Sequence, residues 1–359
     1  MAKKIFFIGI FLLLSVSLYP SRLPLHKAMW QKQLAGGMVQ CQLCPYHCIL
    51  KEGQRGQCGV RKNIGGVLYT LSYGRVASYN IDPIEKKPVF HMLPGSFAYS
   101  LATGGCNLHC KFCQNWQISQ RRPDEIDYVY MKPEDIVAAA KKSGCKSIAY
   151  TYSEPIIFYE LMLETAKLAH AAGLYNIMVT AGFIEEKPLR QLCKYIDAAT
   201  VGLKAFDQDY YSKIVGGRLD VVLRTLKIMK EEGVWVEVVN LVVPTLNDNM
   251  EEIRKMCLWI KDNLGPETPL HFLRFYPMYK LKNLPPTPVE TLEKARQVAL
   301  KAGLKFVYIG NVPGHPAENT YCPHCGKVLI ERVGYGILAN NLHQGRCRFC
   351  GRKIPGIWK

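Results

Sequence analysis

Three cysteines in one short loop have the spacing that binds iron. Residues 100–116 read SLATGGCNLHCKFCQNW, so Cys106, Cys110 and Cys113 form a C-x3-C-x2-C run. Three thiolates can hold three corners of a cubane iron–sulfur cluster, which normally takes four cysteine ligands. The fourth iron could then bind something else, as a catalytic zinc keeps one position open. The loop therefore predicts a 4Fe-4S cluster with one available iron. Three unconnected buried cysteines and an ordinary zinc site are the alternatives.

The neighbours of these cysteines favour the cluster. Phe112 stands directly before the third cysteine, and Gly104 and Gly105 stand directly before the first. Glycine permits the tight backbone turn that a loop around a cluster requires. Residues 97–103 are apolar and strand-like, so we expect the loop to follow a strand.

Two C-x2-C-G motifs near the C-terminus predict a second kind of metal site. CPHCG and CRFCG supply Cys322, Cys325, Cys347 and Cys350, and 21 residues lie between Cys325 and Cys347. Four thiolates on two such turns are typical of a tetrahedral zinc ribbon. Because four protein ligands leave no open position, we expect this zinc to be structural. The basic and aromatic residues around it would also suit RNA or a protein partner.

A third group of cysteines lies near the N-terminus. The stretch CQLCPYHCILKEGQRGQC contains Cys41, Cys44, Cys48 and Cys58, and glycines in its loop would let the chain enclose one metal site. His47 is a weaker ligand candidate. Zinc and a second iron–sulfur cluster are both chemically possible, and the spacing does not choose between them. Four free thiols, or a disulfide pair in an exported protein, are the alternatives.

Composition agrees with a globular metalloprotein in a reducing compartment. Most of the 14 cysteines of the 359-residue chain fall in the three groups, and Cys145, Cys193 and Cys257 are expected in the core. The formal net charge is +17, and residues 21–62 and 322–359 each hold seven Lys or Arg against one Glu. Such basic ends could attract nucleic acid, a membrane surface or an acidic partner, or keep the protein soluble.

The first twenty residues conflict with this picture. MAKKIFFIGIFLLLSVSLYP has the form of a secretory signal peptide, and its apolar run 5–19 is short for a membrane span. An oxygen-sensitive cluster belongs in the cytoplasm. We therefore expect a cytoplasmic catalytic body, with an uncleaved membrane tether through residues 1–20, real export or a start site set too early as open alternatives.

Helical and strand-like segments alternate after the cluster loop. Helices are expected at 133–143, 156–172, 187–195, 219–232, 249–263 and 289–302. Strands are expected at 147–151, 176–180, 198–203, 234–243, 271–275 and 305–309. Short apolar strands that alternate with helices indicate an α/β fold with a buried parallel sheet, either a barrel or an open sheet. In such sheets the chemistry lies at the carboxyl ends of the strands.

Polar residues at those strand ends are the further candidates for a binding site. Glu154 in TYSEP could hold an ammonium group, and Lys204 in GLKAF could pair with a carboxylate or a ribose oxygen. Asn240 and Arg274 occupy comparable positions in NLVVPTLND and HFLRFYP. Residues 309–314, IGNVPG, form a backbone-rich loop that could approach an adenine.

The segment before the first barrel strand carries weaker signals. Residues 65–94 contain a hairpin, whose alternating Val67, Tyr69, Leu71 and Tyr73 fit a half-buried strand. We expect the following stretch, with Lys86, Lys87 and His91, to be a solvated loop.

Taken together, these motifs resemble those of the radical S-adenosylmethionine (SAM) superfamily. Residues 26–359 resemble the radical SAM component of the AmmeMemoRadiSam system, which is related to pyruvate formate-lyase activating enzyme. The resemblance is carried by CQLCPYHC, GQCGVR, YGRVASYNIDPIEKKPVFHMLPGS, TGGCNLHCKFCQNWQIS, TYSEP, LVVPTLND, HFLRFYP, IGNVPG, CPHCG and CRFCG. It departs at Ser153, Ala181 and Gly202, where relatives usually carry Asn, Asn and Asp.

The resemblance implies a fold and a cofactor set. The fold is a partial (β/α)6 TIM-like barrel that binds a 4Fe-4S cluster and SAM, with companion proteins and an electron donor as partners. Combined with the cysteine groups, it predicts four regions: a hydrophobic leader or anchor at 1–23, a Cys-rich module and hairpin at 24–95, the barrel at 96–315 and a zinc ribbon-like module at 316–359.

Three functions compete on this basis. The first is a radical SAM enzyme that abstracts hydrogen from an undetermined substrate, for which the basic ends make a nucleoside or RNA one option. The second is an activase that installs a glycyl radical on a partner enzyme. The third is a metal-cluster protein for electron transfer or nucleic-acid binding, without SAM chemistry.

Overall fold

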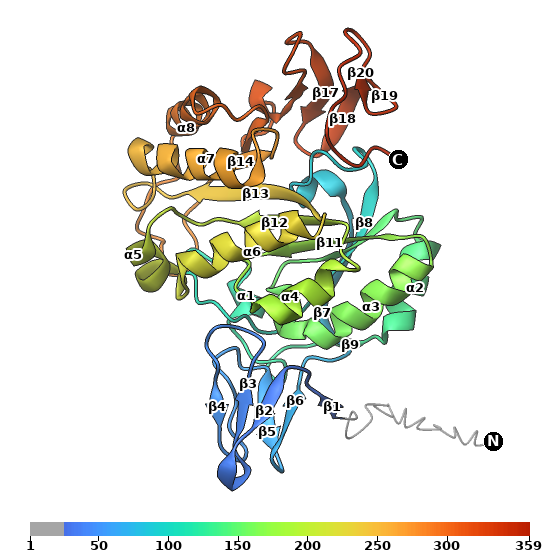
Figure 1. Cartoon of the computed structure of the whole chain (residues 1–359), viewed down its shortest axis with the longest axis vertical. Helices are drawn as coiled ribbons and strands as arrows, with labels where there is room; N and C mark the ends of the chain where they lie inside the picture. Colours follow the sequence, from blue (N-terminus) through green and yellow to red (C-terminus); the bar gives the residue numbers. More distant parts are fainter. Residues whose placement is uncertain (1–24) are drawn as a thin grey trace, which may run out of the picture.

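A central nine-stranded sheet organises the chain (Figure 1). A computed structural model of the protein describes residues 25–359, and the leader predicted at 1–23 lies outside them. The strand order is β15-β14-β13-β12-β11-β10-β8-β7-β9. Its parallel strands are β8 (Phe97–Thr103), β10 (Ser147–Tyr150), β11 (Tyr175–Thr180), β12 (Ala198–Gly202), β13 (Trp235–Val242), β14 (Leu270–Arg274) and β15 (Val307–Gly310). The predicted α/β fold with a parallel sheet is therefore confirmed.

Six crossovers connect the seven parallel strands, and each carries a helix. The main helices are α2 (Pro133–Lys142), α3 (Tyr159–Ala171), α4 (Glu186–Cys193), α6 (Leu219–Glu231), α7 (Met250–Leu264) and α8 (Val289–Lys301), with the short α1 (Trp116–Ser119) and α5 (Gln208–Tyr210) in addition. Each new strand is added on the same side of the previous one. Right-handed crossovers in that order put the helices on one face of the sheet. The opposite face is left for other segments to close.

Antiparallel strands extend the sheet beyond β8. The strand β7 (Arg75–Pro83) pairs with β8 from Val76 to Pro83, and its opposite edge pairs with the short β9 (Val129–Tyr130) at Arg75 and Val76. The hairpin predicted within 65–94 is present but begins earlier, because β5 (Arg61–Ile64) pairs with β6 (Val67–Thr70). In β6, Leu68 and Thr70 are buried, and Val67 and Tyr69, two of the alternating residues named above, are half-buried.

Small β-structures lie at opposite ends of the molecule (Figure 1). The N-terminal one contains β1 (His26–Lys27), β2 (Gln31–Gln33), β3 (Val39–Cys41) and β4 (Ile49–Leu50), together with β5 and β6. The C-terminal one contains β16 (Thr320–Tyr321), β17 (Val328–Val333), β18 (Gly336–Asn340), β19 (Leu342–His343) and β20 (Arg346–Cys347). Within residues 25–359, no helix is long and apolar enough to cross a membrane.

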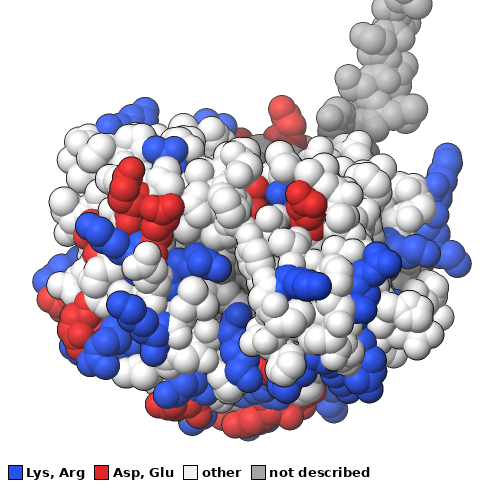
Figure 2. Space-filling view, turned by 90° about the horizontal axis from the view of Figure 1, so that it is seen from above, with Lys and Arg blue, Asp and Glu red and all other residues white. Residues whose placement is uncertain are grey.

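The positive charge is distributed rather than gathered on the face that Figure 2 shows. Lys and Arg side chains lie there among groups of Asp and Glu. Ion pairs also mix the two signs of charge on the protein surface, since Arg190 pairs with Glu186, Glu231 and Glu232. This mixed pattern is typical of a solvated protein surface, whereas a nucleic-acid site is usually a continuous basic stripe.

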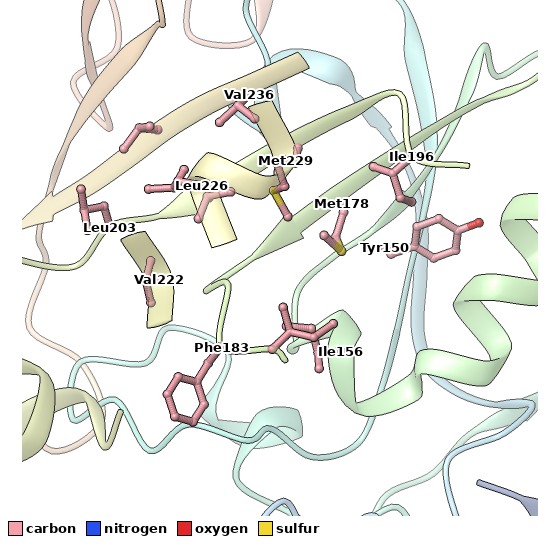
Figure 3. Packing of buried hydrophobic residues seen from close by; sticks show 14 of the residues in the cluster. Tyr150, Ile156, Met178, Phe183, Ile196, Leu203, Val222, Leu226, Met229 and Val236 are labelled. Carbon is pink, nitrogen blue, oxygen red and sulfur yellow. The ribbon is translucent and has the colours of Figure 1, made fainter. Parts of the chain in front are cut away.

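The helices hold the sheet through apolar side chains at helical spacing. Val222, Leu226 and Met229 of α6 are buried and lie near Val236 of β13 (Figure 3). Their spacing of three and four residues forms one continuous stripe on the helix. Truncating one such side chain to alanine typically costs about 2–5 kcal/mol. The expected core cysteines Cys145, Cys193 and Cys257 are also buried.

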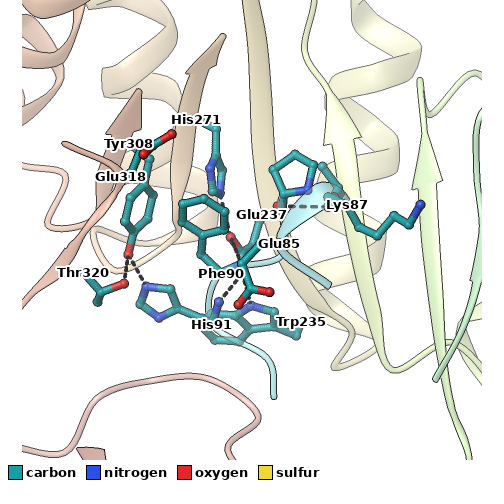
Figure 4. Close-up of polar contacts among 12 residues, drawn as sticks. Glu85, Lys87, Phe90, His91, Trp235, Glu237, His271, Tyr308, Glu318 and Thr320 are labelled. Carbon is teal, nitrogen blue, oxygen red and sulfur yellow. Dashed lines mark hydrogen bonds and ion pairs between the residues drawn. The ribbon is translucent and has the colours of Figure 1, made fainter. Parts of the chain in front are cut away.

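Most of the stretch predicted to be a solvated loop is instead buried, although Lys86 is exposed as expected. Lys87 and His91 are 1% and 0% exposed, respectively. The buried carboxylate of Glu237 on β13 accepts hydrogen bonds from the backbone N–H groups of Phe90 (3.0 Å) and His91 (2.8 Å) and contacts the His271 ring at 2.7 Å (Figure 4). A solvent-facing loop would not need such internal partners, and burial requires them. The hydrophilic composition of this stretch hid its place in the core.

Hydrogen bonds fix the neutral form of His91. Its Nδ1 lies 2.8 Å from the Pro355 carbonyl, which can only accept, so this nitrogen carries the proton. Nε2 then accepts from the Tyr308 hydroxyl at 2.7 Å. Burial lowers the pKa of His91 to about 4, despite the attraction of the Glu237 carboxylate. The neutral ring thus joins the C-terminal tail to the sheet, and protonation would remove the acceptor that Nε2 offers to Tyr308.

This histidine predicts a pH-dependent stability. Because the folded-state pKa lies below the unfolded value near 6.5, protonation favours the unfolded chain as the pH falls from about 6.5 to 4. We expect the free energy of unfolding to fall by about 1.4 kcal/mol per pH unit in that window. Urea unfolding at pH 7, 6 and 5 measures this slope. His91→Gln should flatten it, and the control His170→Asn, at an exposed residue of α3, should not. Equal slopes in all three proteins would contradict this account.

Candidate active site

The carboxyl ends of the parallel strands open into one large cavity. Its volume is about 600 Å³, which is in the range of small-molecule sites. Cys106, Cys110 and Cys113 all line it, and so do Glu154 and Lys204. The structure therefore brings together five of the predicted site residues. The cavity lies where α/β sheets usually place their chemistry.

The cluster loop is held by a turn that has no room for a side chain. Gly105 has a φ of +103°, which disfavours other residues. A Cβ on Gly105 would lie 2.6 Å from Cγ2 of Val60 and 3.0 Å from the carbonyl oxygen of Cys58. Packing against the N-terminal structure, in addition to the tight turn itself, therefore requires glycine before the first cysteine.

Each thiol of the loop has a distinct surrounding. The backbone N–H of Leu108 donates to Sγ of Cys106 at 3.3 Å, and the Ser119 hydroxyl lies 3.1 Å from Sγ of Cys113. Burial raises the pKa of Cys110 to about 12, although the Lys204 ammonium opposes this. The metal-free thiol is thus protonated at neutral pH, and metal binding must release its proton. Donors aimed at sulfur suit a bound thiolate.

Glu154 is a fixed carboxylate at the end of β10. It is buried, and its oxygens accept hydrogen bonds from the Thr180 hydroxyl (2.5 Å) and from the backbone N–H groups of Ala181 (2.8 Å) and Ile156 (3.3 Å). Burial raises its pKa, while those donors pull in the opposite direction. The side chain is therefore oriented in advance, with one edge on the cavity.

Lys204 occupies the space that a side chain at residue 202 would fill. Its Nζ lies 2.4 Å from the position of a Cβ on Gly202. The Lys204 backbone is held in turn, because its N–H donates to the Tyr211 hydroxyl at 3.0 Å and its carbonyl accepts from Nδ2 of Asn247 at 2.7 Å. The absence of a side chain at Gly202 therefore decides where the ammonium lies.

Two predicted residues do not line this cavity. Nδ2 of Asn240 donates to the Leu203 carbonyl at 2.8 Å, and Nε of Arg274 donates to the Thr287 carbonyl at 2.8 Å. Side chains alternate along a strand. Val239 and Leu273 face the cavity, so the next residue on each strand points away. A direct cofactor contact of Asn240 and Arg274 stays a prediction, while their observed contacts brace the backbone.

The sequence reasoning missed a polar group on the cavity wall. The Asp82 carboxylate accepts hydrogen bonds from Lys86, from Lys87 and from the Tyr152 hydroxyl. Burial lowers the pKa of Lys87 to about 8, although Asp82 raises it. Lys86, Lys87 and Tyr152 line the same cavity as the cysteines. The close spacing of acidic and basic residues in DPIEKKP is the only sequence signal for this group.

The C-terminal cysteines form a compact four-thiol site. Each C-x2-C-G motif folds in the same way, because Gly326 donates to the Cys322 carbonyl (2.9 Å) and Gly351 to the Cys347 carbonyl (2.8 Å). Sγ of Cys322 lies 3.6 Å from that of Cys350. The other pair, Cys325 and Cys347, is separated by 3.7 Å. A tetrahedral zinc with Zn–S of about 2.3 Å places its sulfurs roughly 3.8 Å apart. The geometry is thus compatible with a zinc ribbon-like module.

The N-terminal cysteines lie elsewhere. Cys41, Cys44, Cys48 and Cys58 line a separate, smaller cavity. His47 does not line that cavity, and its ring pairs with Glu185 at 3.2 Å.

Comparisons with known proteins agree with the site. The family model described as the radical SAM superfamily matches residues 100–260. Uncharacterized protein MJ0808 of Methanocaldococcus jannaschii is 51% identical over 332 residues, which cover 92% of this chain and 99% of that protein. Pyruvate formate-lyase-activating enzyme of Clostridium pasteurianum is 25% identical over 209 residues, 56% of this chain and 87% of that one.

A solved structure is also similar. A radical SAM methyltransferase from Sphaerobacter thermophilus aligns at 15% identity with a TM-score of 0.47, over 60% of this chain and 67% of that one. The family match covers the cysteine loop and the ends of β8, β10, β11, β12 and β13, and the long relative extends the similarity over most of the chain. The chain therefore belongs to the radical SAM superfamily and is an enzyme.

Proposed function

We propose that this enzyme cleaves SAM reductively at a 4Fe-4S cluster held by Cys106, Cys110 and Cys113 and then removes a hydrogen atom from a substrate in the same cavity. The observation that carries the proposal is that these three cysteines line one cavity together. Among the described residues that line it, there is no fourth cysteine. This donor set fits a cluster with one available iron.

The bound cluster and SAM would supply one electron and a 5′-deoxyadenosyl radical, which is chemistry that the side chains cannot perform. The side chains of the protein bind and orient the ligand in the cavity. Glu154, fixed by Thr180 and Ala181, is placed to accept from an ammonium group. Lys204 is placed to pair with a carboxylate or a ribose oxygen. Both side chains line the cavity beside the cysteines, as a ligand that bridges them would require.

The group around Asp82 supports a polar substrate. Lys86 and Lys87 donate to the Asp82 carboxylate and border the cavity, and each ammonium has further N–H groups for a substrate. The Tyr152 hydroxyl, whose proton goes to Asp82, can accept a hydrogen bond there. A substrate with a carboxylate, phosphate or carbonyl group would suit this wall. A nucleoside fits that description, and so does an RNA end.

The sequence motifs support a narrower assignment. The chain carries the motifs of the radical SAM component of the AmmeMemoRadiSam system, and we propose that it works with the companion proteins of that system and with a low-potential electron donor. Zinc in the C-terminal four-thiol site belongs to the same proposal, as does a cytoplasmic location of the catalytic body. The sulfur separations of 3.6 and 3.7 Å support the zinc assignment.

An activase for a glycyl-radical enzyme is the second candidate. It is favoured by the similarity to pyruvate formate-lyase-activating enzymes. For this candidate, deuterium from the glycine of the partner should appear in 5′-deoxyadenosine. For the first candidate, deuterium should appear in 5′-deoxyadenosine when the labelled compound is a small molecule or an RNA. A metal protein without SAM chemistry would yield no 5′-deoxyadenosine at all.

Variants of the cluster loop and of the C-terminal four-thiol site should lose different properties. We expect Cys106→Ala to abolish the formation of 5′-deoxyadenosine, because the cluster loses one of only three protein ligands. Cys347→Ala should instead release about one zinc per chain and lower the thermal midpoint. Chromatography of 5′-deoxyadenosine and elemental analysis of anaerobically prepared protein measure both. A folded, iron-replete Cys347→Ala protein without SAM cleavage would contradict this division.

Gly202 should act through Lys204. In Gly202→Ala the new methyl group would meet Nζ of Lys204, so the ammonium must leave its place. We expect the dissociation constant for SAM to rise roughly three- to tenfold in Gly202→Ala and in Lys204→Met. The double variant should be no worse than either single variant, because both changes remove the same interaction. Calorimetric titration with SAM checks this, and additive losses would show that Gly202 acts independently of Lys204.

A further inference from the structure

The four N-terminal cysteines surround a second cavity beside the first. Cys41 ends β3, Cys44 and Cys48 lie in the turn that follows, and Cys58 precedes β5. The backbone N–H of Cys41 donates to the Cys48 carbonyl at 2.9 Å, which closes that turn. All four residues line one cavity, with mainly apolar neighbours such as Leu43, Ile156 and Ile157. Four cysteines around one cavity have the arrangement of a metal-binding site.

The spacing of these thiols differs from that of a single-ion site. The sulfurs of Cys322, Cys325, Cys347 and Cys350 all lie within 4.8 Å of one another, and residues 25–359 contain no other such group. Neither the N-terminal four nor the three cysteines of the cluster loop form a group as compact as this one. In a cubane each thiolate binds a different iron, so its cysteine sulfurs stay farther apart than around one tetrahedral ion. This spacing favours a multi-iron cluster over zinc.

A buried cation at the cavity lacks one acceptor. Arg61 is 1% exposed and lines the cavity. Its terminal nitrogens donate to the Met29 carbonyl at 2.6 Å and to Glu160 at 2.5 Å, while Nε has no partner. A buried donor without an acceptor is costly. A sulfur of an anionic cluster would provide the missing acceptor, and its negative charge would suit the guanidinium.

The second cavity is in direct contact with the cluster loop. The carbonyl of Cys58 and the side chain of Val60 meet Gly105, the residue before Cys106. Asn107, the residue after Cys106, lines the N-terminal cavity. Tyr46 lines the N-terminal cavity, and its hydroxyl donates to the Gly216 carbonyl. The neighbouring Val215 carbonyl accepts from the backbone N–H of His109, in the cluster loop, at 2.9 Å. One layer of residues therefore separates the two cysteine groups.

We propose that Cys41, Cys44, Cys48 and Cys58 hold a second 4Fe-4S cluster, which passes electrons one at a time into the cluster of Cys106, Cys110 and Cys113. The electron transfer to the first cluster rests on the proposed function, whereas the presence of the second cluster does not. A flavodoxin- or ferredoxin-type protein gives one electron to the second cluster, which is thereby reduced. The second cluster is reoxidised when the first accepts that electron, and no bond or proton changes in the step.

Metal content tests the cluster. Anaerobic reconstitution of the full chain with iron and sulfide should give about eight irons per chain, and the triple variant Cys106→Ala/Cys110→Ala/Cys113→Ala should keep about four. Mössbauer spectra should assign those four to a cubane, and its reduced EPR signal should not change when SAM is added. The control Cys257→Ala, which removes a core thiol outside the three groups, should keep all the iron.

Zinc in place of iron would overturn the proposal. If the wild-type chain holds about four irons and about two zinc ions, the N-terminal site is a zinc site. This reading uses the wild-type protein, so it does not depend on how well the triple variant folds. Wild-type protein that cleaves SAM with about four irons would refute the second cluster alone. Protein that binds about eight irons and does not cleave SAM would refute the proposed function alone.

The electron donor tests the relay. In Cys44→Ser, SAM cleavage driven by dithionite, which can reduce the first cluster directly, should stay within about twofold of wild type. Cleavage driven by reduced flavodoxin should fall by about tenfold or more, because the path through the second cluster is lost. An unchanged rate with both reductants would overturn the relay. An equal loss with both would also overturn it, because the effect would then be structural.

Discussion

The close contact between Gly105 and the N-terminal structure is the constraint on which the active site depends. The loop with the three cysteines leaves β8 through this turn, and the carbonyl of Cys58 and the side chain of Val60 occupy the space that any larger residue would need. The position of the loop is therefore set jointly by the sheet and by a segment some fifty residues earlier in the chain. Interiors are packed so tightly that such a contact transmits small displacements rather than absorbing them.

Buried polar groups fasten the remaining parts to the same sheet. Glu237 receives backbone donors from the segment before β8 and contacts His271 on β14, and His91 connects Tyr308 with the C-terminal tail (Figure 4). Such groups are costly unless every one finds a partner, so they specify one arrangement. Arg332 adds a further link, because it donates to the Phe90 carbonyl at 2.9 Å and lies over the Phe90 ring. The C-terminal β-structure with its four-thiol site is thereby joined to the segment that forms one wall of the cavity.

Local patterns were sufficient for the elements and for the centre of the site. The strand predicted at 97–103 coincides with β8, and the predicted helices and other strands differ from the observed ones by a few residues at most, because apolar periodicity and glycine stops are local signals. The rule that chemistry lies at strand ends placed Glu154 and Lys204 correctly beside the cysteines. The same rule does not tell which face of a strand a residue takes, and for that reason Asn240 and Arg274 lie outside the cavity. The burial of Lys87 and His91 depends on partners far away in the sequence, and no local pattern reports them.

The one-sided arrangement of the helices has an evolutionary consequence. The inner face of the sheet is closed by segments outside the repeating strand–helix units, including the segment with Lys87 and the β17–β18 turn with Gly334 and Tyr335. Among these segments, exposed parts such as the β17–β18 turn can change in length or residue type without disturbing the strands beside the three cysteines. Descendants of one ancestral scaffold could thus acquire new substrates through these segments while the iron-binding loop stayed the same.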